Sequence, residues 1–517
     1  MAWARAALAV VVVVAVGIVV VSGGSDAGPR TPAALPGMPP PFLGTAVTGD
    51  GGLTVAVDAY GDVVDLRPSP AGPALIDNPS ARQAAGTVQA DTGIVPRVGV
   101  DGGPALPLWA ADSVAQRYLP GTNVVRTVAR FGQVEATVTV AAAGLSLAVD
   151  VATRGGGTPS ASVNVESGIR CARERRAGQL DLLCRVGRAV PPVSGAAAGE
   201  VRNATARTTR AAASNDRSWL ARALPLGADA PTWARRMYGR SLLVLHALTD
   251  RHTGAVAAGA RDGWTYVWPR DAATAALSFA AGGYRGEGQR VARFLRTLDL
   301  GAAARFADDG SPVPGRGPQG DASGWVAIAA EGSGLEAGWT GYAPLAGTGR
   351  DRPDYQEGAA GDFLGNAIAN GGGLRPFETP RGLVRRARDP SSGLDSAAGW
   401  AVQPFPRPPF FPAVRHTLRN LAAGQTPYGI TPGEGWRGGS DPWTAPTAWT
   451  AWAFAALGDR PQALRLLADL RRAATQAGSL PERVDAKTGV PRSTTPLAWS
   501  HAFAILALRQ LWPPGPP

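Results

Sequence analysis

Three loops in the C-terminal half of the sequence place aromatic rings beside carboxylates and arginines, each just before an apolar helical stretch. They are 262–273 (DGWTYVWPRDAA), 428–449 and 479–502. Flat aromatic faces stack on sugar rings, and Asp, Glu and Arg form paired hydrogen bonds with neighbouring hydroxyls. Loop-stapling tryptophans and solvated charges would explain any single example, but three such loops in one region predict a carbohydrate pocket.

The candidate sugar contacts in these loops are aromatic residues and one Arg-Asp pair: Trp264, Tyr266, Trp268, Arg270, Asp271, Trp436, Trp443 and Trp499. Cleavage of a glycosidic bond also needs two carboxyl groups, one protonated and one ionised. Spacing alone does not select that pair from the carboxylates of the region. Glu482 follows a proline in a loop that can fix its side chain. Glu357 is expected to open a small-residue helix over 358–369, whose dipole would favour the carboxylate anion.

Two regions of different periodicity would position these residues. Between 42 and 200, segments such as 53–59 and 133–140 alternate apolar and polar residues, which predicts an N-terminal antiparallel β-sandwich. A linker is expected at 201–229. From 230 to 512 the spacing is helical, with long irregular loops, which predicts an all-α barrel or toroid. The expected helices cover 270–282, 287–299, 322–331, 358–369, 411–422, 445–457, 460–475 and 496–511.

The N-terminus carries an export signal. Arg5 precedes sixteen apolar residues at 6–21, which as a helix would span ~24 Å, short of the ~30 Å of a bilayer core. Residues 1–22 are therefore expected to be a signal peptide or a short signal-anchor helix. A Pro/Gly-rich tether follows at 23–41. Either alternative exports the rest of the chain, and an uncleaved segment would make the membrane a partner.

Charge and cysteine usage exclude other classes. The net charge is +11, but the arginines are scattered without an interleaved aromatic platform, so nucleic acid is not an expected partner. The two cysteines, Cys171 and Cys184, are expected to form a disulfide across a hairpin that turns near Gly178. Two thiols and four scattered histidines offer no metal-ligand spacing, so neither a metal nor another cofactor is expected.

Five segments between 230 and 512, taken in order, resemble glycoside hydrolase family 15, the family of glucoamylase, glucodextranase and bacterial trehalase. They are YVWPRDAATAAL, PQGDASGWVAIAA, PDYQEGAAG, TPGEGWRGGSDPWTAPTAWTAWAF and LPERVDAKTGVPRSTTPLAWSHAFAILAL. The resemblance implies an (α/α)6 barrel and inversion at an α-glucosidic bond. It also implies Glu482 as the base that activates water, Glu357 as the acid, and Arg270 and Asp271 as the grip on the sugar at the cleaved end.

The sequence departs from the family at three positions. Gln356 stands where the family has Trp, Ile430 where fungal glucoamylases have a substrate-binding Arg, and Arg483 where a Gln follows the base. The leading hypothesis is an exported inverting hydrolase of α-glucans or related α-glucosides. The departures motivate a rival, a degenerate member that binds cell-envelope glycan without cleaving it. A phosphorolytic relative is a third hypothesis, although the sequence has no separate phosphate loop. The oligomeric state is left open.

Overall fold

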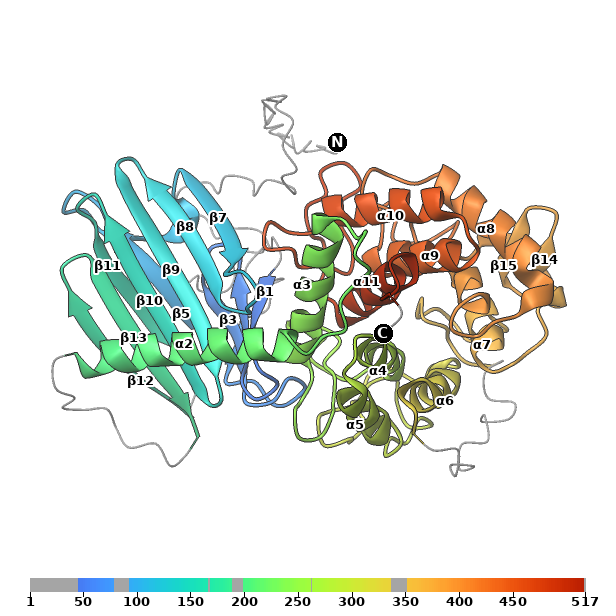
Figure 1. The fold of residues 1–517 in the computed structure, drawn as a ribbon, viewed down its shortest axis with the longest axis horizontal. Helices are drawn as coiled ribbons and strands as arrows, with labels where there is room; N and C mark the ends of the chain where they lie inside the picture. The colour runs from blue at the N-terminus through green and yellow to red at the C-terminus, as the bar shows by residue number, and fades with distance from the viewer. Residues whose placement is uncertain are drawn as a thin grey trace, which may run out of the picture.

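The computed structural model describes residues 45–78, 93–165, 168–187, 199–261, 263–335 and 351–515. The chain forms an N-terminal β region and a C-terminal helical region that lie side by side (Figure 1). The expected signal or anchor segment (1–22) and tether (23–41) lie outside the described residues. No helix within the described ranges is long and apolar enough to cross a membrane.

The β region consists of two antiparallel sheets that share one apolar core, as the period-two pattern predicts. Apolar side chains such as Val55 and Val138, one from each sheet, are fully buried in this core. The first sheet contains β1 (Thr45–Gly49), β2 (Thr54–Asp58), β3 (Val63–Arg67), β4 (Ile76–Asp77), β5 (Gly93–Gly99), β6 (Ala105–Pro107) and β11 (Thr158–Asn164). The second contains β7 (Ser113–Tyr118), β8 (Val125–Phe131), β9 (Val134–Ala143), β10 (Ser146–Arg154), β12 (Ile169–Arg176) and β13 (Gln179–Val186).

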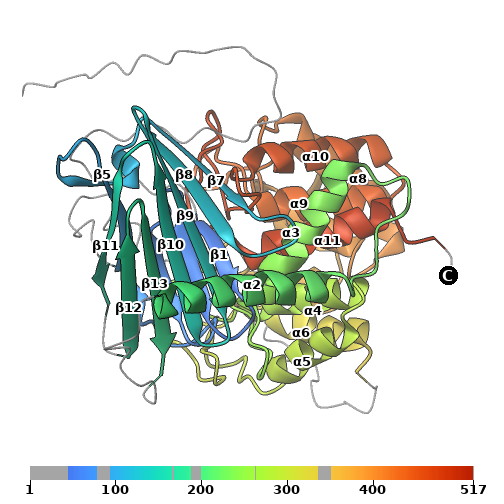
Figure 2. The ribbon, with the colours of Figure 1, turned by 60° about the vertical axis from the view of Figure 1, so that its left-hand side comes forward.

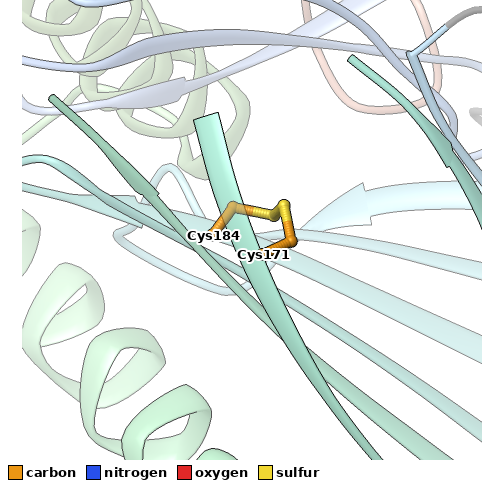
Figure 3. Close-up of a disulfide and its surroundings, with 2 residues drawn as sticks. All are labelled: Cys171 and Cys184. Carbon is orange, nitrogen blue, oxygen red and sulfur yellow. A yellow bond between two sulfur atoms is a disulfide. The ribbon is translucent and has the colours of Figure 1, made fainter. Parts of the chain in front are cut away.

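The hairpin of β12 and β13 carries the two cysteines. Cys171 and Cys184 are direct cross-strand partners in the register of these strands and are joined by a disulfide (Figure 3). Gly178 supplies the left-handed conformation of the turn, with φ of 67°, which glycine adopts without a steric penalty. The predicted disulfide is confirmed.

Most of the expected linker at 201–229 is a helix, α2 (Glu200–Leu220). It packs along β9, β10 and β13, over the outer face of the second sheet (Figure 2). Ala212 and Ala213 contact Val124 and Ala141 of the β region, while three of the helix's four arginines are exposed. The sheet buries one narrow apolar stripe of this largely polar segment, and that burial stabilises the helix.

The helical region contains α3 (Thr232–Leu248), α4 (Pro269–Ala281), α5 (Arg285–Leu295), α6 (Ala322–Ser333), α7 (Leu364–Ala369), α8 (Phe411–Ala423), α9 (Thr444–Ala456), α10 (Arg460–Ala473) and α11 (Ala498–Leu511). It also contains the 3-10 helix η3 (Ser396–Ala401). A small sheet of β14 (Glu378–Thr379), β15 (Gly382–Arg386) and β16 (Asp389–Leu394) lies between α7 and η3 along the chain. Nothing in the periodicity predicted this sheet.

The elements α4, α6, α7, η3, α9 and α11 contact one another in that order, and α11 contacts α4 again. This closed series is called the inner ring below. Helices α3, α5, α8 and α10 pack against α11, α4, η3 and α9 from outside. Trp325, Trp400, Trp449 and Phe503 meet mainly edge to face within the ring. These large buried rings fill the space between the inner elements and fix how their ends are placed.

Candidate active site

A cavity of about 280 Å³ is lined by residues at the N-terminal ends of inner-ring elements. Arg270 and Asp271 come from the first turn of α4, Trp499 from the first turn of α11, and Trp443 directly precedes α9. The full lining is Trp264, Trp268, Arg270, Asp271, Arg316, Tyr355, Gln356, Glu357, Trp436, Arg437, Trp443, Glu482, Arg483, Ser493, Leu497 and Trp499. The ring therefore gathers loops that lie more than 200 residues apart in the sequence.

Every residue predicted for the site lines this cavity except Tyr266. Trp264 and Trp268 stack on each other, with ring centroids 5.1 Å apart, and form one wall. Tyr266 lies instead beneath the guanidinium of Arg305, whose Cζ is 4.8 Å from its ring centroid. The expectation that Tyr266 lines the cavity is wrong.

The part of the cavity formed by Arg270, Asp271, Glu482 and Trp499 is called the deep end, because these residues are all buried. Arg270 Nη1 donates to both carboxylate oxygens of Asp321, at 2.8 and 3.1 Å, and to the side-chain oxygen of Gln319 at 2.9 Å. The Arg270 and Asp321 side chains are only 5% and 1% exposed. Arg270 also lies over the Trp499 ring, 4.7 Å from its centroid. Asp321 therefore holds Arg270 in place.

Glu482 is fixed through its main chain on both sides. Its N–H donates to the carbonyl of Thr494 at 2.9 Å, and its carbonyl accepts from the N–H of Thr444, the first residue of α9, at 3.0 Å. The Ser493 hydroxyl donates to Glu482 Oε2. Burial raises the pKa of Glu482 to about 7, against the hydrogen bond from Ser493 and the charge of Arg483. This glutamate can therefore exist in either protonation state near neutral pH.

Asp271 shares this desolvated environment. Burial raises its pKa to about 7, the positive charge of Arg270 opposes the shift, and the negative charge of Asp321 adds to it. Asp271 also raises the pKa of Glu482, so the two carboxyl groups act on each other. Perturbed carboxylates that converge on one cavity are typical of catalytic sites.

The rim of the cavity is formed by Glu357, Arg316, Trp436 and Arg437, which are partly or fully exposed. The Glu357 carboxylate forms an ion pair with Arg316 and accepts from Gln319 Nε2 at 3.4 Å. Arg437 Nη2 donates to the main-chain carbonyl of Glu357 at 2.9 Å. Arg316 also stabilises the charge of Glu482, so this guanidinium acts on both carboxyl groups. Sequence reasoning missed Arg316 and Arg437, although both lie within or beside motifs it used.

The backbone around Glu357 differs from expectation. The helix expected over 358–369 begins only at Leu364, so Glu357 lies on a turn, with φ of 53°, and its N–H donates to the Asp354 carbonyl at 3.0 Å. Gly358 and Gly361 disfavour a helix here, and Gly361 instead forms a β-bridge with Arg352. The predicted helix-dipole effect on Glu357 is wrong; the ion pair with Arg316 stabilises its anion instead.

Gln356 occupies the position where the family carries Trp, and its side chain belongs to a buried hydrogen-bond network. Its side-chain amide donates to Asp395 Oδ2 and to the Tyr355 hydroxyl, both at 3.1 Å. Tyr355 in turn donates to Asp395 Oδ1 at 2.7 Å. Asp395 caps η3 by accepting from the N–H of Ala397 at 2.8 Å. This buried network ties the Glu357 loop to the inner ring.

The other two departures fall in different environments. Arg483 lines the cavity beside Glu482. Ile430 does not line it; its side chain is 2% exposed and belongs to the apolar core of the helical region. Relative to the family pattern, the cavity therefore lacks an arginine from position 430 and gains one at position 483.

The β region supports the loop that follows Glu482. The Thr45 hydroxyl donates to the main-chain carbonyl of Thr495. Arg261 Nε donates to the Asn78 carbonyl at 2.7 Å, and the Thr494 hydroxyl donates to the Arg261 carbonyl at 3.3 Å. Hydrogen bonds thus run from the sandwich to Thr494, whose carbonyl accepts from the N–H of Glu482.

Within the described ranges, no group of three or more His, Cys, Asp and Glu residues is arranged to hold a metal ion. The chemistry of the cavity is that of two glutamates in unlike environments, a buried Arg-Asp pair, and aromatic walls. Two carboxyl groups facing one small cavity can supply general acid and general base catalysis.

Comparisons with known proteins place the fold. No family model and no curated protein matches the sequence. A bacterial glucoamylase solved in complex with acarbose matches at a TM-score of 0.68 and 14% identity, over 95% of this chain and 96% of that chain. The chain therefore has a glucoamylase-like fold that includes both regions, in agreement with the resemblance to glycoside hydrolase family 15.

Two further matches cover a little over half of this chain. A wild-type glycosidase aligns with 57% of this chain and 98% of its own, at 20% identity and a TM-score of 0.45. A glucoamylase from Saccharomycopsis fibuligera aligns with 54% of this chain and 95% of its own, at 14% identity and a TM-score of 0.45. Because both TM-scores lie below 0.5, neither adds to the fold assignment.

Proposed function

We propose that this protein is an exported glycoside hydrolase that cleaves α-glucosidic bonds in α-glucans or related α-glucosides with inversion. The observation that carries the proposal is the convergence of Glu357 and Glu482 on one cavity walled by tryptophans. The glucoamylase-like fold supports it. We also propose that the inner ring and the outer helices form an (α/α)6 barrel, and the closed series of inner contacts supports this.

In the proposed reaction, Glu482 in its ionised form takes a proton from a water molecule that attacks the anomeric carbon. Glu357 in its protonated form gives a proton to the leaving oxygen as the glycosidic bond breaks. Arg270 and Asp271 at the deep end bind hydroxyls of the sugar at the cleaved end, and Trp499 and the Trp264–Trp268 wall contact its ring. The ion pair between Arg316 and Glu357 must open before Glu357 can act as the acid.

That ion pair is also the observation that favours the rival proposal, a glycan-binding protein without hydrolytic activity. A glutamate locked to an arginine would leave a cavity that holds sugars and transfers no proton. A cleaved signal peptide would make either protein secreted, and an uncleaved segment would anchor it outside the membrane.

A substrate panel separates these proposals. Purified protein is incubated with maltooligosaccharides, isomaltose and trehalose while released glucose is measured, and binding is followed in parallel by isothermal titration calorimetry. Glucose release without added phosphate supports hydrolysis. Binding with no glucose released over a long incubation supports the rival, and release that requires phosphate supports a phosphorolytic enzyme. If the protein neither binds any sugar of the panel nor releases glucose from it, an α-glucoside site is contradicted.

A further inference from the structure

The rim of the cavity and the adjacent wall carry three arginines: Arg316, Arg437 and Arg483. The Arg316 side chain is 36% exposed, Arg437 is exposed and Arg483 is partly buried. A fourth arginine, Arg270, lies at the deep end and is already paired with Asp321. The cavity therefore carries its excess positive charge toward its open side.

Two of these arginines have no carboxylate at ion-pair distance within the part of the chain that the structure describes. Arg437 donates to the neutral main-chain carbonyl of Glu357. Arg483 pairs its backbone with Trp443, and its charge acts on Glu482 without an ion pair. Arg316 is paired with Glu357. Two guanidinium groups thus remain at the cavity with their charges uncompensated by direct pairing.

A neutral sugar does not require this charge. Guanidinium groups form paired, charge-assisted hydrogen bonds with carboxylates and phosphates, and these are stronger than bonds to hydroxyls. The buried deep end takes the sugar at the cleaved end, so the rest of the substrate extends toward the rim. Arg437 and Arg483 are therefore placed to meet the leaving group rather than the sugar that is released.

We propose that the substrate carries an anionic group, a carboxylate or a phosphate, on its leaving-group side, bound by Arg437 and Arg483. This inference rests on the proposed function and names the leaving group of that same reaction. It also gives Arg316 a role. An anion at the rim competes with Glu357 for Arg316, and opening of that ion pair is the step that proton donation by Glu357 requires.

The test compares two pairs of probes, each with one member that carries an anionic group on the leaving-group side and one member that is neutral. Maltobionate is compared with maltitol for a carboxylate, and trehalose 6-phosphate with trehalose for a phosphate. For one pair we expect kcat/KM to be about tenfold higher for the anionic probe at low salt. Added NaCl should reduce this preference, since screening weakens exposed charge interactions.

Variants assign the preference to the rim. Arg437→Gln and Arg483→Gln should each lower the anionic-to-neutral ratio of kcat/KM several-fold, whereas Arg375→Gln, at an exposed arginine outside the cavity, should leave the ratio unchanged. Thermal unfolding checks that each variant is folded. Equal kcat/KM for both members of both pairs overturns the inference, as does a preference that survives both cavity substitutions.

Failure of the proposed function gives a different pattern. If no probe is cleaved, hydrolysis of these α-glucosides is contradicted, and calorimetric binding then decides the inference alone. Tighter binding of maltobionate or trehalose 6-phosphate than of its neutral partner, lost in Arg437→Gln, supports an anion site. Equal binding, or no binding of any probe, overturns it.

Discussion

The deep end and the rim of the cavity use opposite means to control a glutamate. At the deep end, Glu482 is 5% exposed, and burial raises its pKa to about 7. At the rim, the Glu357 side chain is 32% exposed and its charge is paired with Arg316. Desolvation thus makes Glu482 able to carry or release a proton near neutrality, while Glu357 depends on a partner that a substrate can displace. In the proposed reaction, the environment of Glu482 is already set before the substrate binds, whereas Glu357 becomes active only after the substrate displaces Arg316.

The largest loss of activity is expected from a substitution at the deep end. Glu482→Gln removes the base while keeping the shape of the side chain, and we expect kcat to fall by about 10⁴-fold. Glu378→Gln, at an exposed position of the helical region, serves as the matched control and should retain full activity. A Glu482→Gln variant that keeps more than a tenth of wild-type activity would remove Glu482 from the mechanism.

Asp321→Asn tests whether the deep end is held by its buried ion pair. The substitution leaves the Arg270 guanidinium buried with a neutral partner, so we expect a loss of about 3–5 kcal/mol in the free energy of unfolding. Glu287→Gln, in an exposed pair with Arg222, should cost less than about 1 kcal/mol. Denaturant titration of both variants makes the comparison, and equal losses would contradict a structural role for Asp321.

Glu357→Gln tests the rim, and its effect should depend on the leaving group. We expect a loss of about 10²–10³-fold on an alkyl α-glucoside, whose leaving oxygen needs a proton. On an aryl α-glucoside with an acidic phenol the loss should be much smaller. Glu482→Gln should impair both substrates alike, since water attack is required in each case. The same loss on both substrates in Glu357→Gln would argue against its role as the acid.

The direction of the pH dependence of kcat/KM shows whether Glu482 acts as a base or as an acid. A base acts in its ionised form, so with a Glu482 pKa of about 7 activity should rise about tenfold per pH unit below that value. Asp271, whose pKa is raised likewise, would give a limb of the same sign. Ser493→Ala isolates Glu482, because loss of its hydrogen bond raises the pKa of Glu482 and should move the limb to higher pH. Activity that instead falls above pH 7 on this limb would assign Glu482 as the acid.

Many of the helices and most of the site residues could be predicted from the sequence, because apolar spacing marks the helices and the loop motifs mark the site. Helices α4, α6, α8, α9, α10 and α11 lie within two residues of the expected starts, since apolar spacing and the prolines and glycines of the loops mark them. The lining tryptophans and both glutamates follow from loops that share one composition. The disulfide follows from two cysteines on one hairpin.

What could not be predicted depends on contacts between distant segments. Helix α2 forms on a sheet face that no local pattern reveals. Tyr266 contacts Arg305, a residue distant in the sequence, instead of lining the cavity. Arg316 gains its role only when its loop meets those of Glu357 and Glu482. In a chain rich in scattered arginines, nothing in the spacing distinguishes Arg316 and Arg437 from the rest.

The most direct test of the central claim is to identify the anomer released at early times. Proton NMR of fresh wild-type digests of whichever panel α-glucoside is cleaved fastest resolves α- and β-glucose before they interconvert. Inversion by Glu357 and Glu482 predicts β-glucose first from the wild type and no early product from Glu482→Gln. Early α-glucose, or β-glucose released at an unchanged rate by Glu482→Gln, would contradict inversion by this pair of glutamates.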